Sequence, residues 1–193
     1  GDFDPGAGIS NLSSAGDEDI FVSKLDSNGN FVWAKSLGST SFDAGWDIVV
    51  DDSGNVYTTG SFTGTGDFDP SGAIYNLSSI GGGDIFISKL NGSGNFIWAR
   101  GMGSTTDDGS SSIALDDNGN VYTTGSFSET MDFDPGVGVH NLTSIGVEDA
   151  FISKLDSDGY YLWAKNIGGT SSYVYSHDLT IDGNGMIYIT GGF

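Results

Sequence analysis

A hairpin-like stretch that occurs three times is the feature that most constrains the fold of this chain. It reads DIFVSKLDSNGNFVWAK at residues 19–35, DIFISKLNGSGNFIWAR at 84–100 and DAFISKLDSDGYYLWAK at 149–165. The copies begin 65 residues apart. Each copy joins two apolar runs through a glycine-centred turn, which is the pattern of a β-hairpin. Three such hairpins at a fixed interval indicate a repeat architecture.

A second hairpin completes each repeat unit. In the first unit a variable loop at 38–45 leads to two strands expected at 47–51 and 56–62, and an arm at 66–83 then leads to the next unit. Each unit of about 65 residues therefore carries four short strands and one arm. Four strands joined by tight turns predict an all-β chain built as a β-propeller of four-stranded antiparallel blades.

The distribution of apolar residues supports stacked blades. In the strand expected at 20–25, apolar residues occupy both alternations, whereas a sheet with one wet face reads apolar then polar. Blades packed face to face bury both sides of each sheet. A β-solenoid is the main alternative, but its coils are usually far shorter than this repeat and give no reason for two distinct hairpins per unit.

The repeat pattern also predicts the domain organisation. We expect one propeller segment over 1–193, with repeat units 1–65, 66–130 and 131–193 and a half-blade at each end. The chain opens in mid-pattern without an initiator Met or a signal peptide, so we interpret it as a piece of a longer protein or a processed one. Known propellers start at about four blades. The half-blades are then expected to pair with remaining blades of the same protein, which we prefer, or with a second copy.

Composition limits the classes of partner. The net charge is −20, from 26 acidic and 6 basic residues, and an anionic surface is repelled by phosphate backbones, so we expect no nucleic-acid partner. The charge fits either solubility or cation binding. No run reaches the roughly 18 apolar residues of a membrane span, so no membrane insertion is expected. The absence of Cys excludes disulfides, thiolate zinc sites and Cys nucleophiles.

Three segments carry a family resemblance. The segments DSNGNFVWAK at 26–35, DDSGNVYTTGSF at 51–62 and GDFDPG at 1–6 resemble the bacterial β-propeller repeats called SBBP repeats, and the match covers all three units. NHL repeats are similar in a more distant way. The arm resembles the version common in large secreted or surface proteins of the Bacteroidota. The resemblance implies a propeller, an extracellular or cell-surface location and type IX secretion, and it implies no particular enzyme activity.

The Asp-Phe-Asp-Pro arms are the candidate metal sites. Their two aspartates lie two residues apart, so both carboxylates face the same way in an extended chain, and Ca²⁺ prefers such oxygen ligands. The alternative is structural, because Asp before Pro also organises turns through hydrogen bonds to the backbone. Calcium is the one cofactor indicated. The candidate ligands are Asp2, Asp4, Asp67, Asp69, Asp132 and Asp134.

The loops between the two hairpins of each unit are the candidate binding sites. They differ among the three units while the strands repeat, and in a blade they lie on the same rim as the arms. Variable loops on a repeated framework often carry binding, although neutral drift also explains them. Aromatic rings beside carboxylates suit a protein or glycan ligand. The candidate residues are Phe42, Trp46, Asp107, Asp108, Tyr173, Tyr175 and His177.

The remaining motifs favour a framework without catalysis. Trp33, Trp98 and Trp163 recur at the repeat interval and predict packing in the core or between blades. The Asp-x-Asn-Gly-Asn type of segment predicts a hairpin turn, because it lacks the later Glu of a calcium loop. Neither His140 nor His177 has a triad context, and no Gly-x-Ser-x-Gly elbow occurs, so we expect no enzyme activity.

The predicted function is therefore a non-catalytic structural or adhesive interaction module within a larger secreted or cell-surface bacterial protein. A carbohydrate-binding propeller with calcium-stabilised arms is the alternative. A glycan-active enzyme ranks third, because 26 acidic residues allow many carboxylate pairs.

Overall fold

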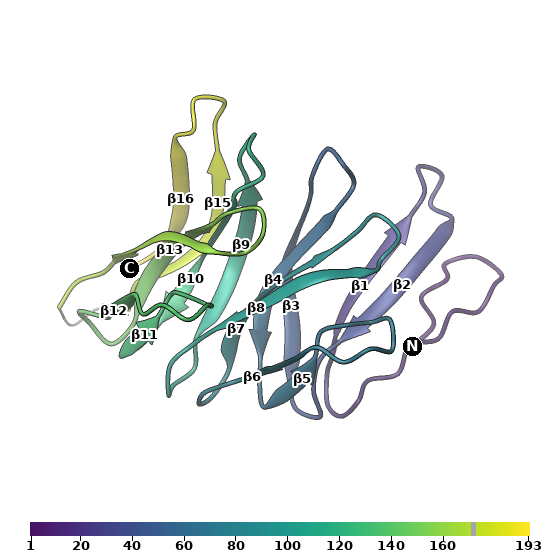
Figure 1. The fold of residues 1–193 in the computed structure, drawn as a ribbon, viewed down its shortest axis with the longest axis horizontal. Coiled ribbons are helices and arrows are strands. Elements are labelled where there is room, and N and C mark those ends of the chain that lie inside the picture. The colour runs from purple at the N-terminus through teal and green to yellow at the C-terminus, as the bar shows by residue number, and fades with distance from the viewer. Residues whose placement is uncertain (171–172) are drawn as a thin grey trace.

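The computed structural model describes residues 1–170 and 173–193, and these form an all-β chain (Figure 1). The first hairpins of the three units are β1 (Ile20–Leu25) with β2 (Phe31–Leu37), β7 (Asp84–Leu90) with β8 (Phe96–Met102), and β13 (Asp149–Leu155) with β14 (Tyr161–Ile167). The second hairpins are β3 (Asp43–Val50) with β4 (Val56–Phe62), β9 (Gly109–Leu115) with β10 (Val121–Phe127), and β15 (Tyr175–Ile181) with β16 (Ile187–Gly192). The arms contain β5 (Thr65–Asp67) with β6 (Asn76–Ser78), and β11 (Thr130–Asp132) with β12 (Asn141–Thr143).

The main sheets combine hairpins from successive units. One four-stranded sheet has the order β3-β4-β7-β8 and the other has the order β9-β10-β13-β14, and all neighbouring strands are antiparallel. Strands β1 and β2 form a two-stranded sheet, as do β15 and β16. Figure 1 shows these sheets side by side in chain order. The prediction of an all-β chain with four-stranded antiparallel sheets is therefore confirmed.

The second hairpin begins earlier than the sequence pattern predicts. Strand β3 starts at Asp43, whereas its start was expected at residue 47. A β-bulge between Gly45 and Asp47 leaves Trp46 without a partner residue on β4. Because a bulge shifts the alternation of side chains by one residue, the period-2 pattern breaks inside the strand. The predicted loop boundary at residue 45 is therefore wrong.

Aromatic residues from strands and arms fill the space between sheets. Phe68 lies in the Asp-Phe-Asp-Pro arm, yet it is fully buried, with its ring 5.3 Å from the rings of both Phe62 and Phe86. Phe133 occupies the corresponding place against Phe127 at 5.3 Å. Aromatic pairs at this separation add to the free energy gained from burial. The arms are thus part of the hydrophobic core.

The hairpin turns are closed by aspartate or asparagine side chains. Asp26 Oδ1 accepts hydrogen bonds from the backbone N–H of Asn28 at 2.8 Å and of Asn30 at 2.9 Å. Gly29 follows with φ of 79°, a conformation that favours glycine. The same geometry recurs at Asp116 and Asp182. The prediction that these segments are hairpin turns is confirmed.

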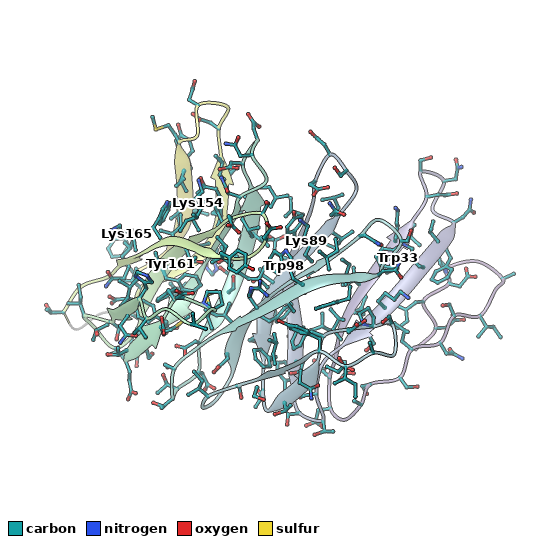
Figure 2. All side chains as sticks on the ribbon, in the orientation of Figure 1. Trp33, Lys89, Trp98, Lys154, Tyr161 and Lys165 are labelled. Carbon is teal, nitrogen blue, oxygen red and sulfur yellow. The ribbon has the colours of Figure 1, made fainter. Side chains whose placement is uncertain are left out.

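The repeated tryptophans pack between successive sheets. Trp33 Nε1 donates a hydrogen bond to the Gly92 carbonyl at 3.2 Å, and Trp98 Nε1 donates to the Ser157 carbonyl at 3.2 Å (Figure 2). In both cases the acceptor belongs to the hairpin turn of the next unit. The prediction that the tryptophan series serves packing is therefore confirmed for these two residues. No helix among the described residues is long and apolar enough to cross a membrane.

Equivalent phenylalanines differ in burial and provide a test of inter-sheet packing. Phe86 is fully buried, whereas Phe21, at the same repeat position, is 60% exposed. We predict that Phe86→Ala lowers the free energy of unfolding by about 3–5 kcal/mol, because it leaves a cavity between sheets. Phe21→Ala is expected to cost less than about 1 kcal/mol. Urea unfolding monitored by tryptophan fluorescence measures both, and equal losses would contradict this assignment of the core.

Candidate functional site

The variable loops and the arms share one rim of the molecule. The backbone N–H of Gly38 donates to the Asp67 carbonyl at 3.1 Å, and the backbone N–H of Asp67 donates to the Gly38 carbonyl at 2.8 Å. These bonds join the loop after β2 to the start of the next arm. The candidate binding loops and candidate metal residues therefore lie at the same end of the sheets.

Two candidate binding residues border an open groove beside β1 and β3. Phe42 is 46% exposed and Trp46 is 61% exposed, and both line a groove of about 500 Å³. Ile48 also lines this groove and is 51% exposed. Trp46 was expected in a rim loop, but it lies within β3 at the bulge. The groove wall is largely apolar and offers two aromatic rings to a ligand.

The candidate residues of the third unit lie in a different place. Tyr175 and His177 belong to β15, and their rings contact each other edge to face with centroids 5.1 Å apart. Tyr173 precedes this strand and is 59% exposed. The neighbouring Ser171 and Ser172 of the predicted loop lie outside the described residues. Because β9 packs between β3 and β15, the structure does not bring this group together with Phe42 and Trp46.

The two candidate aspartates of the second unit support the loop from within. Asp107 Oδ1 accepts a hydrogen bond from the Gly83 N–H at 2.8 Å. Asp108 is buried, and its carboxylate accepts bonds from the N–H groups of Ser104 at 2.6 Å and Ser128 at 3.1 Å. Both side chains thus bind backbone groups. They hold the rim loop in place and leave little of Asp108 for a ligand.

The aspartates of the arms also bind backbone donors. Asp67 Oδ1 accepts hydrogen bonds from the N–H groups of Asp69 at 3.0 Å and Tyr75 at 2.9 Å. Asp2 and Asp132 make the same pair of bonds in their own arms. Each second aspartate in turn caps a tight turn: Asp4 accepts from Gly6, Asp69 from Ser71 and Asp134 from Gly136. Within the described part of the chain, no three His, Asp or Glu side chains gather to hold a metal ion. Calcium binding by the arms stays a prediction.

A pair of buried carboxylates beside the rim was not anticipated from the sequence. Asp84 is 2% exposed, and its Oδ1 has no hydrogen-bond partner, while Oδ2 accepts the N–H of Ile80 at 2.9 Å. Burial raises the pKa of Asp84 from its ordinary value of 3.8 to about 6; the Ile80 N–H opposes this shift and the nearby charge of Asp108 adds to it. Burial also raises the pKa of Asp108. The charge of Asp108 therefore disfavours ionisation of Asp84.

The third unit shows what changes when the second carboxylate is missing. Val174 stands where the second unit has Asp108. There Asp149 accepts hydrogen bonds from the N–H of Ile145 at 2.9 Å and from the side-chain amide of Asn166 at 3.0 Å. In the described structure, the buried side-chain oxygens without a partner are those of Asp19 and Asp84. These are the units in which a second aspartate, Asp43 or Asp108, is present.

A polar cluster on the inner strands is a second feature that sequence reasoning missed. Ser112 Oγ lies 2.8 Å from Asp47 Oδ2 and 2.8 Å from Asp178 Oδ1. The three residues occupy the same position in β3, β9 and β15, so they join three successive units. The single hydroxyl proton of Ser112 is therefore shared between the carboxylates of Asp47 and Asp178. The available signal was a polar residue at the same repeat position in all three inner strands.

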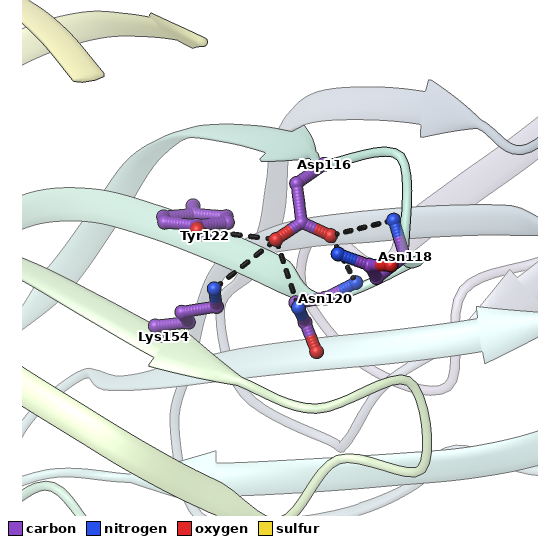
Figure 3. A network of polar contacts seen from close by, with 5 residues as sticks. All are labelled: Asp116, Asn118, Asn120, Tyr122 and Lys154. Atoms are coloured by element: carbon purple, nitrogen blue, oxygen red, sulfur yellow. Dashed lines mark hydrogen bonds and ion pairs between the residues drawn. The ribbon is translucent and has the colours of Figure 1, made fainter. Parts of the chain in front are cut away.

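One ion pair closes the last complete sheet. Asp116 Oδ2 contacts Lys154 Nζ at 3.1 Å and accepts a hydrogen bond from the side-chain amide of Asn120 at 2.8 Å (Figure 3). Burial opposes ionisation of Asp116, but the Asn120 amide, the Lys154 ammonium and the N–H groups of Asn120 and Asn118 lower its pKa to about 2. The Tyr122 hydroxyl also bonds to this carboxylate, at 3.2 Å. The Asp116 carboxylate is therefore ionised at neutral pH and ties its hairpin turn to Lys154.

Four-stranded antiparallel sheets that lie side by side in chain order, each built from two successive units, are typical of β-propeller repeats. Residues 97–126, from β8 to β10, match the family described as "SBBP: Beta-propeller repeat", so the predicted resemblance to SBBP repeats is confirmed for this segment. An uncharacterized WD repeat-containing protein of Acanthamoeba polyphaga mimivirus is 30% identical over 187 residues, covering 86% of this chain. Regulatory protein FlaEY of Caulobacter vibrioides is 29% identical over 149 residues, covering 75% of this chain. The chain spans 13% and 15% of the lengths of these two relatives.

The raised pKa of Asp84 predicts a pH-dependent stability. A carboxyl group with a pKa of about 6 in the native state binds its proton more tightly than in the unfolded state, so stability falls as pH rises from about 4 to about 6. Asp84→Asn removes this charge and keeps an oxygen for the Ile80 N–H. We predict that the variant is more stable than the parent at pH 8, by on the order of 1 kcal/mol, with the difference shrinking below pH 4.

Asp149→Asn is the matched control for this measurement. Asp149 has hydrogen-bond donors at both oxygens, including the Gly146 N–H at 3.3 Å, so losing an acceptor is expected to destabilise the protein at pH 8. Thermal unfolding of both variants across this pH range gives the comparison. Destabilisation by Asp84→Asn at pH 8 would contradict the proposed effect of the Asp108 charge on Asp84.

The arm aspartates provide a separate test of metal dependence. Asp67→Ala removes the acceptor of two backbone N–H groups, so we predict a loss of about 1–3 kcal/mol in unfolding free energy. Because those bonds need no ion, the loss should be the same in chelator and in millimolar Ca²⁺. A loss that appears in Ca²⁺ alone would show instead that the arm binds the cation, since a ligand of the native state raises stability.

Proposed function

We propose that this chain is a non-catalytic interaction module within a larger β-propeller protein that is secreted or displayed at a bacterial cell surface. Its role is to present rim loops and exposed aromatic side chains to a protein ligand on a rigid repeated framework, in structural attachment or adhesion. Export through a type IX route and an origin in the Bacteroidota are parts of this proposal that rest on the sequence resemblance.

The comparisons support the interaction role. One relative carries WD repeats in its name and another is named as a regulatory protein, and both extend well beyond the matched region. Propellers built from such repeats serve widely as non-catalytic binding frameworks. Asp108 and Asp116 are held by backbone donors and by Lys154, which gives these two carboxylates structural roles. The proposal therefore assigns binding to the surface and assigns no reaction to the chain.

The contrast between buried repeated positions and exposed non-repeated ones is the observation that carries the proposal. Phe62 and Phe127 occupy the same repeat position in the first two units, and both are fully buried. By contrast, Trp46 and Tyr175 differ from their repeat equivalents, and both are more than 40% exposed. Exposed aromatic side chains are enriched where proteins bind one another. Variation at exposed positions on a constant framework is what a binding surface requires.

We predict that Trp46→Ala and Tyr175→Ala each weaken ligand binding at least tenfold, because exposed aromatic anchors contribute about 1.4 kcal/mol or more. Partners are captured from a bacterial cell-surface extract, purified, and titrated by calorimetry; a glycan array tests the carbohydrate alternative in parallel.

Val137→Ala is the matched control, because Val137 is fully exposed on an arm away from these strands. Capture that is equal for the parent, both aromatic variants and the control would contradict the assignment of these residues. Glycan binding by the parent protein that is lost in both Trp46→Ala and Tyr175→Ala would favour the carbohydrate-binding alternative over a protein ligand.

A further inference from the structure

Two pairs of aspartates lie where the loop after a first hairpin passes the start of that hairpin. One pair is Asp84, the first residue of β7, with Asp108, which directly precedes β9. Asp84 is 2% exposed and Asp108 is 4% exposed. The equivalent pair one unit earlier is Asp19 with Asp43. We call these the two junction pairs, because β7 and β9 belong to neighbouring sheets (Figure 1).

Each junction pair contains a buried carboxylate oxygen that no donor satisfies. Among the described residues, Oδ1 of Asp19 and Oδ1 of Asp84 are the buried side-chain oxygens without a hydrogen-bond partner. A carboxylate oxygen that is removed from water without a donor costs free energy, so buried polar groups normally have partners. An anionic oxygen left without a donor at the same position of two units therefore points to a positively charged ligand.

In the first junction pair, the two carboxylates border one space. A Cβ on Gly38 would lie 3.3 Å from Asp19 Oδ1 and 2.8 Å from Asp43 Oδ2. Because glycine has no Cβ, Gly38 places no atom of its own at that point. The Asp43 carboxylate is held there by the N–H groups of Ser39 at 2.5 Å and Thr63 at 3.0 Å. The unsatisfied oxygen of Asp19 therefore faces a carboxylate that is fixed in place.

The second junction pair repeats this arrangement. A Cβ on Gly103 would lie 2.5 Å from Asp84 Oδ1, so this carboxylate also packs against the glycine that follows the first hairpin. The Asp108 carboxylate accepts the N–H groups of Ser104 at 2.6 Å and Ser128 at 3.1 Å. Burial raises the pKa of Asp84 most, and the charge of Asp108 raises it further, which requires the two carboxylates to lie close together.

Basic side chains do not neutralise the junction pairs. Over residues 1–170 and 173–193, the ion pair that forms is Lys154 with Asp116. Lys89 and Arg100, in the same unit as the second junction pair, donate to backbone carbonyls of the next turn. Buried charges are usually paired or coordinate a metal ion. The junction pairs lack the first solution, so their geometry favours the second.

The third unit provides a comparison within the same chain. Val174 takes the place of Asp108, and its N–H makes the equivalent backbone bond, to the Glu148 carbonyl at 3.0 Å. Asp149, the first aspartate of this unit, accepts hydrogen bonds at both of its carboxylate oxygens. In the described structure, the unsatisfied oxygen thus occurs where a second carboxylate faces it. A ligand that bridges two carboxylates accounts for this difference.

The donor set selects a hard divalent cation. Two carboxylates carry two negative charges, which one divalent ion neutralises, and the side chains of both pairs offer oxygen donors alone. Ca²⁺ and Mg²⁺ bind such oxygens, whereas transition metals favour imidazole and thiolate ligands. Mg²⁺ usually keeps several of its water ligands. Carboxylates as buried as Asp84 and Asp108 leave little room for a hydrated ion, which favours Ca²⁺.

We propose that each junction pair binds one Ca²⁺ ion between its two carboxylates, and that the third unit binds none at this position. Backbone carbonyls and water complete the ligand set, because a pair supplies only two side chains. The ion of the second pair ties the start of β7 to the loop before β9 and so fixes two neighbouring sheets to each other. These sites are distinct from the arms, whose aspartates bind backbone N–H groups.

Calorimetric titration of the chelator-treated chain with CaCl₂ at pH 8 tests the proposal. We expect two equivalents of Ca²⁺ to bind per chain, and a parallel titration with MgCl₂ to give an affinity at least tenfold lower. Both titrations are run at the same ionic strength, set with NaCl, because a net charge of −20 attracts cations without any specific site. Absence of Ca²⁺ binding above this background overturns the proposal.

Substitutions in the second junction pair locate the ion. Asp84→Asn and Asp108→Asn each remove one charge and keep an oxygen for the backbone donors, so each variant should bind one equivalent of Ca²⁺ instead of two. The stability comparison made above for Asp84→Asn applies to the chain in chelator, where the variant melts at a higher temperature than the parent. In millimolar Ca²⁺ this order should reverse, because the ion stabilises the native state of the parent at this site and not that of the variant.

Asp149→Asn and Asp69→Ala are the matched controls. The first changes the equivalent aspartate in the unit that carries Val174, and the second removes an arm aspartate that caps a turn, so both variants should still bind two equivalents. Two equivalents retained by both Asp84→Asn and Asp108→Asn overturn the junction site. Loss of Ca²⁺ in Asp69→Ala but not in Asp84→Asn assigns the ion to the arms and likewise overturns the proposal.

Discussion

The whole structure depends on sheets that are apolar on both faces. A strand such as β7 is buried along its entire length, so no sheet of this kind is stable until another sheet or arm covers each face. This requirement explains why the arms place Phe68 and Phe133 in the core and why the loops are tied to the arms by backbone bonds. It also makes each unit dependent on its neighbours, as in other repeat proteins.

Much of the fold can be predicted from the sequence, because comparison of the three units shows which positions recur. The predicted strand at 20–25 coincides with β1, since an apolar run and a glycine-centred turn define it. The start of β3 was wrong because the bulge at Gly45 shifts the alternation, and the equivalent Ser-rich segment of β9 has no apolar signal at all. Local pattern predicts a regular strand well and an irregular one poorly.

The candidate site was predictable as a set of residue types but not as an arrangement. Sequence comparison between units identified Trp46 and Tyr175 as variable, yet it gave no information on which inner strand separates them. The burial of Asp84 and Asp108 was hidden for a different reason: a carboxylate at a strand end or in a loop is normally solvated. The Asp84 carboxylate packs against Gly103, where a Cβ would lie 2.1 Å from its carboxyl carbon, and only tertiary structure shows this contact.

The repetition also distinguishes the residues that build the framework from the residues that can determine specificity. The sequence predicts that Trp33 and Trp98 serve packing, and the structure also uses their N–H groups to hold the next turn. A side chain constrained in this way cannot drift to suit a ligand, because a change at one unit breaks the junction with the following unit. Binding is therefore free to evolve only where junctions are absent, at positions such as Phe42 and Tyr173 on the rim. The acidic excess adds a further constraint, since a surface of charge −20 favours ligands that are neutral or basic.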